Sequence, residues 1–428
     1  MPARRRAVAW LAATALIAGG CSGSHAASSG RAASVPSPAT SSAGPPGLQV
    51  PPAHAALKVA RRYLTALAEG NGAEADTMAA PAGAAAAKRL EQLRAWFGAL
   101  PVARAAATAS PAARPSSSPA PDRAVAVALR ARLAGSPATD RVPLGTRVLL
   151  LAPANGRWRV ADDVTADPSV GVQPSGLDAV RQPRVMRGAN ATVIYGAGAR
   201  REAAEIRKLA AAAAPDLHGT YGGGPAAAHP LILAVEDSTQ ADQVMGRDVG
   251  QVLPAGSVSG PFAYVFLRQY RRIDPVSRGA MMTGLMTHLA TQRSLGRAPT
   301  SLRAGVDAYE QNRYLNSRGY GLPLDRIAAA YPAYPTLDRW TTRQPLWGLN
   351  GPAQQLAGQD ALAMVHVILT RHGGAPALRR LGRAFDHTGS DITPADVQRA
   401  FRRALGVSFA SVVSEAHAYA KGGSWKFS

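Results

Sequence analysis

The chain has 428 residues, enough for two or three domains, and its 48 Lys and Arg against 27 Asp and Glu give a formal net charge of +21. A single Cys excludes a disulfide framework and any Cys-rich zinc or iron–sulfur site. Beyond the N-terminus no long apolar run occurs, which excludes a polytopic membrane protein. Pairs of Arg recur but are scattered and form no basic stripe with interleaved aromatic residues, so we expect no nucleic-acid partner.

Residues 1–21 have the layout of a secretory signal, with a basic start, an apolar stretch too short to span a bilayer, and small residues at the cut. The last four, Ala18-Gly19-Gly20-Cys21, resemble the lipobox of bacterial lipoproteins. In such proteins the Cys is lipidated and becomes the mature N-terminus. The resemblance implies lipidation of Cys21 and an extracytoplasmic protein anchored to the cell membrane. A plain secretory signal with an incidental Cys is the alternative.

Residues 22–52 are rich in Ser, Ala, Pro and Gly and nearly uncharged. Such a composition cannot bury enough apolar area to fold, so we predict a tether between the lipid and the first domain.

A first domain, 53–168, is predicted to be α+β, with helices followed by an antiparallel meander. The dipeptide Asn155-Gly156 is typical of a type I′ hairpin turn. The order resembles the cystatin-like cone of nuclear-transport-factor-like domains. No acid, base or metal cluster is evident in it, so we expect a scaffold or a binding module. The predicted elements are helices Ala56–Ala68 and Ala84–Leu100, a low-complexity loop Thr108–Pro121, and strands Ala124–Leu133, Arg147–Ala152 and Trp158–Ala161.

A Pro- and Gly-containing connector, 169–183, leads into a second domain, 184–428. Its first part is predicted to alternate strands and helices, and from Val276 the chain is predicted to be almost wholly helical. The elements of the first part are strand Ala191–Tyr195, helix Ala199–Ala214, strand Pro230–Val235, a helix or loop to Arg247, and strand Phe262–Leu267.

A dinucleotide-binding fingerprint is only partly present at the start of this domain. Gly196 and Gly198 lead from a strand into a helix, but Arg201 stands where the third Gly belongs. Asp216 lies in an Ala-, Pro- and Gly-containing stretch and does not end a following strand. We therefore expect no nucleotide cofactor.

The stretch from Val276 to Tyr309 resembles the zinc-site region of the peptidase MA-like, gluzincin type of secreted metallopeptidase. That family carries His-Glu-x-x-His on one helix and Pro-x-Trp-x-x-Glu-Gly-x-Ala-x-Tyr on the next. Two His four residues apart share a helix face, the Glu between them is the general base, and the downstream Glu is the third ligand. The resemblance extends to a buried helix at Ala361–Gly374 and to closing helices within Phe385–Tyr419, and it implies a mainly helical domain with an N-terminal mixed sheet.

Most of the chemistry of that family is missing from this sequence. Gly284 stands where the first His belongs, Leu285 where the catalytic Glu belongs, and Ala304 where the third ligand belongs. His288 matches the second His, and Tyr309 the family's Tyr. One imidazole holds zinc poorly, and without the carboxylate nothing takes the proton from water.

A rebuilt metal site is the alternative. Asp307 and Glu310 lie about one and two turns beyond Ala304, so either could lean toward His288. His366 lies in an apolar run and is predicted to be a core residue, and His372 is predicted to lie near a helix C-terminus.

Taken together, the sequence predicts a lipoprotein anchored through Cys21 whose peptidase-like domain is a non-catalytic binding protein. It needs no cofactor, and its partner is expected to be a peptide, a protein or an anionic envelope polymer. The alternative is a zinc-dependent hydrolase with a remodelled site around His288, Asp307 and Glu310.

Overall fold

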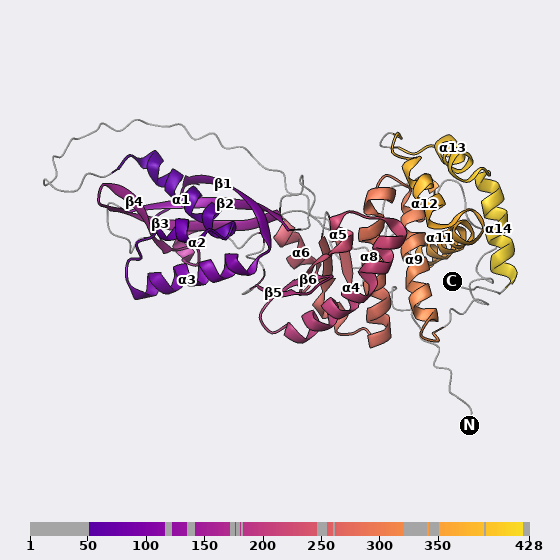
Figure 1. Cartoon of the computed structure of the whole chain (residues 1–428), viewed down its shortest axis with the longest axis horizontal. Coiled ribbons are helices and arrows are strands. Elements are labelled where there is room, and N and C mark those ends of the chain that lie inside the picture. Colours follow the sequence, from indigo (N-terminus) through magenta and orange to yellow (C-terminus); the bar gives the residue numbers. More distant parts are fainter. Residues whose placement is uncertain are drawn as a thin grey trace, which may run out of the picture.

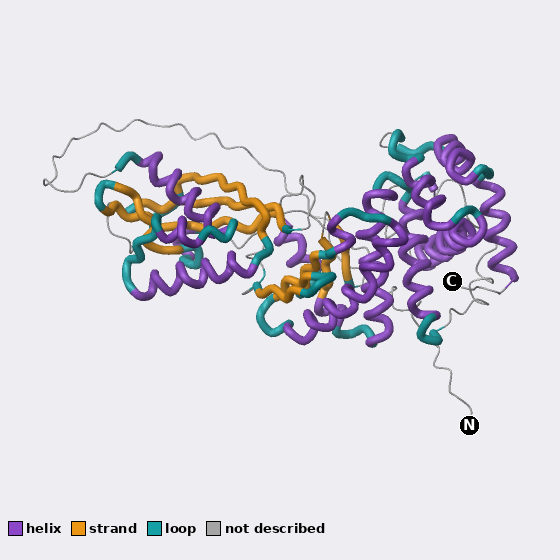
Figure 2. Tube along the Cα trace, viewed as in Figure 1, coloured by secondary structure: helices purple, strands orange, loops and turns teal. Residues whose placement is uncertain are grey.

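A computed structural model shows a mixed α+β protein in which two sheets are followed by a helical part (Figures 1 and 2). It describes residues 51–115, 122–134, 142–171, 176, 180, 183–245, 255–259, 262–320, 340–341, 351–388 and 391–422. Cys21 and the signal and tether predicted around it lie outside these residues. Among the described helices, none is both long and apolar enough to cross a membrane.

The first unit is a four-stranded antiparallel sheet in the order β1-β2-β3-β4, with helices packed on one face. Alternate residues of β2 (Val125, Val127 and Leu129) face these helices because side chains on a strand alternate between its two faces. The β3–β4 turn has positive φ at both Asn155 and Gly156, which confirms the predicted hairpin. The elements are α1 (Ala53–Ala68), α2 (Gly72–Asp76), α3 (Ala84–Ala99), β1 (Val102–Pro111), β2 (Arg123–Leu133), β3 (Val142–Ala154) and β4 (Arg157–Asp163).

The loop predicted at Thr108–Pro121 is wrong at its start, because Thr108–Pro111 belongs to β1. β1 is made largely of Ala, Thr and Ser, and Ala is depleted in strands, so its own residues gave no strand signal. The strand forms through its continuous pairing with β2, from Ala105 opposite Ala131 to Pro111 opposite Val125.

The start of α1 is hydrogen-bonded to β4, the edge strand opposite β1. No side chain caps this helix at its N-terminus, and the preceding residue is Pro52. The indole Nε1 of buried Trp158 on β4 donates a hydrogen bond of 3.1 Å to the Pro52 carbonyl. The first turn of α1 is therefore held by β4 as well as by its own packing.

The second sheet has five strands in the order β5-β6-β7-β9-β8. β6, β7 and β9 pair in parallel, and β5 and β8 close the two edges in antiparallel fashion. The parallel strands are buried on both faces, as expected for parallel strands covered on each side. The strands are β5 (Arg184–Arg187), β6 (Thr192–Tyr195), β7 (Leu231–Val235), β8 (Gly256–Ser259) and β9 (Phe262–Phe266).

One face of this sheet packs on long helices, and the opposite face shares a core with the first unit. Ile232 and Val265 belong to the helical core, whereas Leu233, Phe262 and Phe266 belong to the cluster that also contains the interior of the first unit. In Figure 1 the second sheet lies between the first unit and the helical part. The helices are α4 (Arg200–Tyr221), α5 (Pro225–Ala228), α6 (Ser238–Met245), α7 (Leu267–Tyr270), α8 (Pro275–Leu295), α9 (Thr300–Asn316), α11 (Gly351–Arg371), α12 (Gly374–Arg383), α13 (Pro394–Leu405) and α14 (Phe409–Gly422).

Helix α4 runs two turns beyond its predicted end at Ala214, through Pro215 to Tyr221. A Pro inside a helix loses a hydrogen bond and normally ends the helix. Here the turns beyond Pro215 are held by burial of Leu217 and Tyr221 in the helical core, so tertiary packing overrides the local signal.

Helices α9 and α11 approach each other closely at Gly305. A Cβ placed on Gly305 would lie 2.4 Å from the Ala361 carbonyl oxygen, which is backbone and cannot move aside easily. The absence of a side chain at Gly305 therefore sets the distance between the two helices that carry Asp307 and His366.

Candidate functional site

The candidate site is built on α8 and α9, which form a packed helical pair. Helix α8 begins cleanly because Asp274 accepts hydrogen bonds from the backbone N–H groups of Val276 and Ser277, and Pro275 occupies the first turn. Most of α8 is buried, since it lies between the second sheet and the other helices. Side chains on α8 consequently meet protein on nearly every side.

The two positions where the resemblance would place a ligand and a general base lie inside the core. Gly284 and Leu285 are both buried, and Leu285 is 0% exposed. The Leu285 side chain packs against Gly256 of β8 so closely that a Cβ on Gly256 would be 2.9 Å from the Leu285 Cδ1. A carboxylate at position 285 would therefore lie in an apolar contact between helix and sheet.

His288, where the sequence resemblance would place the second zinc-binding His, contacts Asp307 directly. Its Nδ1 lies 2.9 Å from Asp307 Oδ2, and the side chains are 16% and 7% exposed. An ionised carboxylate only accepts hydrogen bonds, so Nδ1 is the donor in that state, and the other ring nitrogen, Nε2, is left to act as base or ligand. Of the two carboxylates considered from the sequence, Asp307 is the one brought to His288.

Burial raises the pKa of the Asp307 carboxyl above its usual value, while the charge and hydrogen bond of His288 and the charge of Arg303 act in the opposite direction. Asp307 Oδ1 is buried and has no hydrogen-bond partner in the part of the chain described. The His288 imidazole therefore contacts a carboxyl group whose ionised form is disfavoured by burial.

Glu310 does not reach His288 and belongs to a different cluster. It accepts a hydrogen bond of 2.6 Å from the buried Tyr221 hydroxyl on α4 and one of 2.6 Å from Arg313 Nε. Arg313 also pairs with Asp216, which the sequence had placed in an irregular stretch and which lies on α4. Burial, followed by the nearby Glu310 charge, raises the pKa of Tyr221 well above its usual value.

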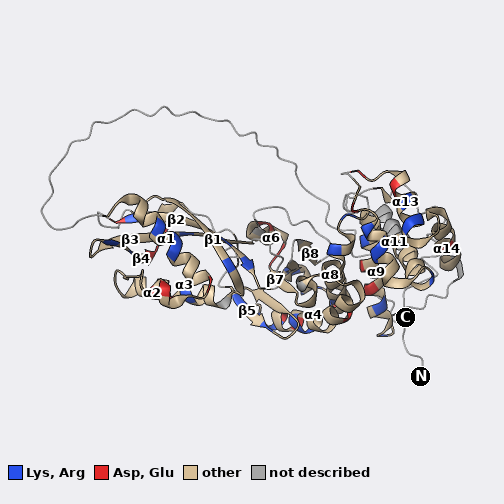
Figure 3. Ribbon diagram, turned by 45° about the horizontal axis from the view of Figure 1, so that its top comes forward, with Lys and Arg blue, Asp and Glu red and all other residues tan. Residues whose placement is uncertain are grey.

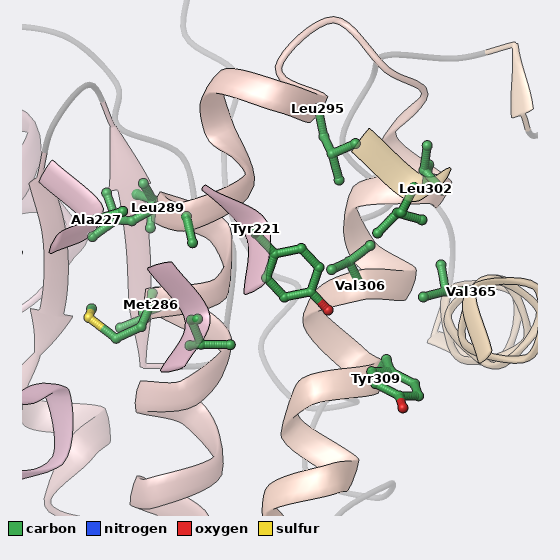
Figure 4. Packing of buried hydrophobic residues seen from close by; sticks show 14 of the residues in the cluster. Tyr221, Ala227, Met286, Leu289, Leu295, Leu302, Val306, Tyr309 and Val365 are labelled. Atoms are coloured by element: carbon green, nitrogen blue, oxygen red, sulfur yellow. The ribbon is translucent and has the colours of Figure 1, made fainter. Parts of the chain in front are cut away.

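This cluster fixes α4 against α9 and was missed from the sequence. Figure 4 shows Tyr221 lying between the apolar side chains of α8 and α9, with its hydroxyl directed toward α9. The only sequence signal was the i, i+3 spacing of Glu310 and Arg313, which is common on solvated helices. Because Glu310 accepts hydrogen bonds from Tyr221 and Arg313, it is not available as a metal ligand beside His288.

A gluzincin zinc site does not fit these residues. Where the family has two imidazoles and a carboxylate, the chain offers His288 alone, with Asp307 one turn beyond the position of Ala304. No group of three or more His, Cys, Asp or Glu within the described ranges could hold a metal ion. No family model matches the sequence, and comparisons with curated proteins and with solved structures give no match. The site is therefore interpreted from its own geometry.

The two other histidines considered from the sequence lie where they were predicted. His366 is 1% exposed on α11, stacked on Tyr419 at 4.4 Å between ring centroids. His372 follows the last residue of α11, and its Nε2 lies 3.1 Å from a Glu415 oxygen. Neither histidine is brought to His288 by a described contact.

Proposed function

We propose that the protein is a lipid-anchored extracytoplasmic binding protein, with a cystatin-like first domain at 53–168 and a peptidase MA-like domain at 184–428 that does not catalyse hydrolysis. The mixed sheet with an antiparallel edge strand against α8 supports the second assignment. The ligand is a peptide, a partner protein or an anionic envelope polymer.

The burial of Leu285 carries this proposal. Hydrolysis by a zinc peptidase requires a carboxylate that contacts the attacking water, and that carboxylate has to face an open site. At position 285 an apolar side chain instead packs against β8 and is 0% exposed. The face of α8 on which a zinc peptidase would carry its general base is therefore packed against the sheet.

Anchoring is tested by replacing Cys21 with Ser. Because Cys21 is the only Cys, the variant has no sulfur for a lipid, and we expect the protein to move from the membrane fraction into the medium. Fractionation of cells followed by immunoblotting measures the shift. A Cys21→Ser protein that remains in the membrane fraction would show that another feature anchors the chain.

A hydrolase with a remodelled site is the second candidate, and the His288–Asp307 contact is the observation that favours it. An imidazole oriented by a buried carboxylate is a common arrangement both for a general base and for a metal ligand. Glu310 is no part of this candidate, since it is held by Tyr221 and Arg313.

Metal loading separates the two candidates. After the Cys21→Ser protein has been incubated with zinc and passed through a desalting column, we expect far less than one zinc per chain, because His288 and Asp307 supply too few ligands. Atomic absorption measures the metal. Stoichiometric zinc that is lost in His288→Ala, but kept in His372→Ala as the matched His control, would refute the non-catalytic proposal.

A further inference from the structure

A groove of about 500 Å³ lies on the first unit, between α1 and the β1 edge of the sheet. One wall is a stripe along α1 at helical spacing, and the other is the middle of β1. The lining residues are Lys58, Arg61, Arg62, Thr65 and Ala66 on α1, Glu69 directly after its last residue, Glu74 on α2, and Ala106 and Ala107 on β1. This site is separate from α8 and α9, and the inference does not depend on the proposed function.

The backbone of β1 is open toward this groove. The Ala105 N–H donates a hydrogen bond of 2.9 Å to Oε1 of Glu69, the residue that caps the C-terminus of α1, so at Ala105 the backbone faces away from β2. Backbone direction alternates along a strand, so Ala107 and Ala109 face the same way. No hydrogen bond to an outward N–H at either position occurs in the described structure. Glu69 thus covers one end of the edge and leaves the next two positions able to pair with a further strand.

The lining of the groove carries a net charge of +1, because three cations on α1, whose basic residues appear blue in Figure 3, outnumber the carboxylates of Glu69 and Glu74. Lys58 and Arg61 are exposed and form no ion pair with any described acid. Arg62 pairs with Glu74 at 2.5 Å in an exposed position, where such a pair contributes little. A segment lying in the groove would therefore meet two unneutralised cations from the helix and two unpaired backbone positions from the strand.

Charge decides which segment fits. The chain's own residues 22–52 contain no Asp or Glu, so the tether does not complement Lys58 and Arg61. A second copy of β1 contains no acid either and would add its own Arg104 to the groove. We propose that the groove binds an extended, acidic segment of a partner protein, which adds as a fifth strand beside β1 and places its carboxylates against Lys58 and Arg61.

The proposal makes separate demands on backbone and charge, so two kinds of variant test it. Lys58→Glu/Arg61→Glu reverses the charge of two exposed side chains, and Lys88→Glu/Arg157→Glu is the matched control, with the same charge change at exposed positions outside the groove. Ala107→Pro removes the outward N–H without removing a bond of the β1–β2 ladder, because Pro is tolerated on an edge in that orientation.

The probe is a fluorescein-labelled seven-residue peptide of alternating Val and Glu, titrated with the Cys21→Ser protein and followed by fluorescence anisotropy. Two companion peptides have Lys in place of Glu, or N-methyl groups on alternate backbone nitrogens. We expect the Glu peptide to bind at least tenfold more tightly than either companion, and at least tenfold more weakly to Lys58→Glu/Arg61→Glu. The matched control should bind it within twofold of wild type.

Several outcomes would overturn the proposal. One is equal binding of the Glu and Lys peptides, and another is binding that N-methylation leaves unchanged. Failure of the Glu peptide to bind the folded wild type would do the same. Light scattering on the wild type tests whether a second copy of this chain occupies the groove instead. A dimer that Ala107→Pro dissociates would show that β1 pairs with β1 of another copy, and this would also overturn the proposal. Thermal unfolding of each variant tests whether it is folded. If Ala107→Pro is not folded, the charge-reversed variant and the N-methylated peptide still test the proposal.

Discussion

Replacing His288 with Ala should lower the free energy of unfolding by about 3 kcal/mol at pH 7.5, because it leaves the buried Asp307 carboxyl without its partner. The Asp307 residue as a whole is only 5% exposed and its second oxygen is already unpartnered among the described residues, so the nearby charge of Arg303 compensates only in part. Urea unfolding of the Cys21→Ser protein, with and without the His288→Ala change, measures the difference.

The same loss should depend on pH with a defined sign. The pKa of the Asp307 carboxyl is raised in the folded protein, and removing the imidazole takes away contributions that lower it. A carboxyl with a raised folded pKa favours the folded state at low pH, and this stabilisation is lost as the pH rises from the unfolded value of about 4 through the folded one. His288→Ala should therefore be less destabilised at pH 5 than at pH 7.5.

A second variant separates charge from packing. Adding Asp307→Asn to His288→Ala removes the buried charge at nearly constant volume, so the double variant should be more stable at pH 7.5 than His288→Ala alone. The exposed His54→Ala is the control for removing an imidazole, and it should change stability by less than about 0.5 kcal/mol. A His288→Ala protein as stable as His54→Ala would contradict the buried pairing of His288 with Asp307.

The second large effect is expected at His366 in acid. Burial, with a smaller contribution from the Arg371 charge, lowers the pKa of His366 to about 4. The unfolded chain then binds a proton that the folded one does not, so stability is present above pH 6.5 and is lost as the pH falls toward 4. The expected loss is about 2–3 kcal/mol.

His366→Phe should remove this loss while keeping an aromatic ring against Tyr419, on which His366 is stacked. Between pH 7 and pH 4 the wild type should lose about 2–3 kcal/mol more than the variant in urea unfolding, and His54→Phe, at an exposed histidine, should follow the wild type. If His366→Phe and the wild type lose stability in parallel, His366 does not stay neutral in the folded protein.

The strands that the sequence predicted are those with their own hydrophobic pattern. β2 alternates apolar residues and β4 follows an Asn-Gly turn, so both were found. β1 consists mostly of small residues and β8, Gly256–Ser259, of Gly, Ser and Val, so neither shows the apolar pattern of a strand on its own. Each of these two missed strands forms by pairing with the strand that follows it in the chain.

The residues of the candidate site were likewise predictable only in part from the sequence. Spacing on a helix placed both Asp307 and Glu310 within reach of His288, because residues three apart share a broad face. It could not decide between them, since the choice depends on α4, whose Tyr221 binds Glu310 from a position 89 residues earlier. The burial of His366 was predictable because its apolar neighbours on α11 already indicated a core position.

If the protein is anchored through Cys21 as proposed, the hydrogen bond between Trp158 and Pro52 has a mechanical consequence. A pull on the chain that precedes α1 would then reach this helix through Pro52. Without a restraint there, the uncapped first turn of α1 would be the first to peel away. Because the indole of Trp158 binds the Pro52 carbonyl, part of such a load would pass to the β3–β4 hairpin before it reached the α1 wall of the groove.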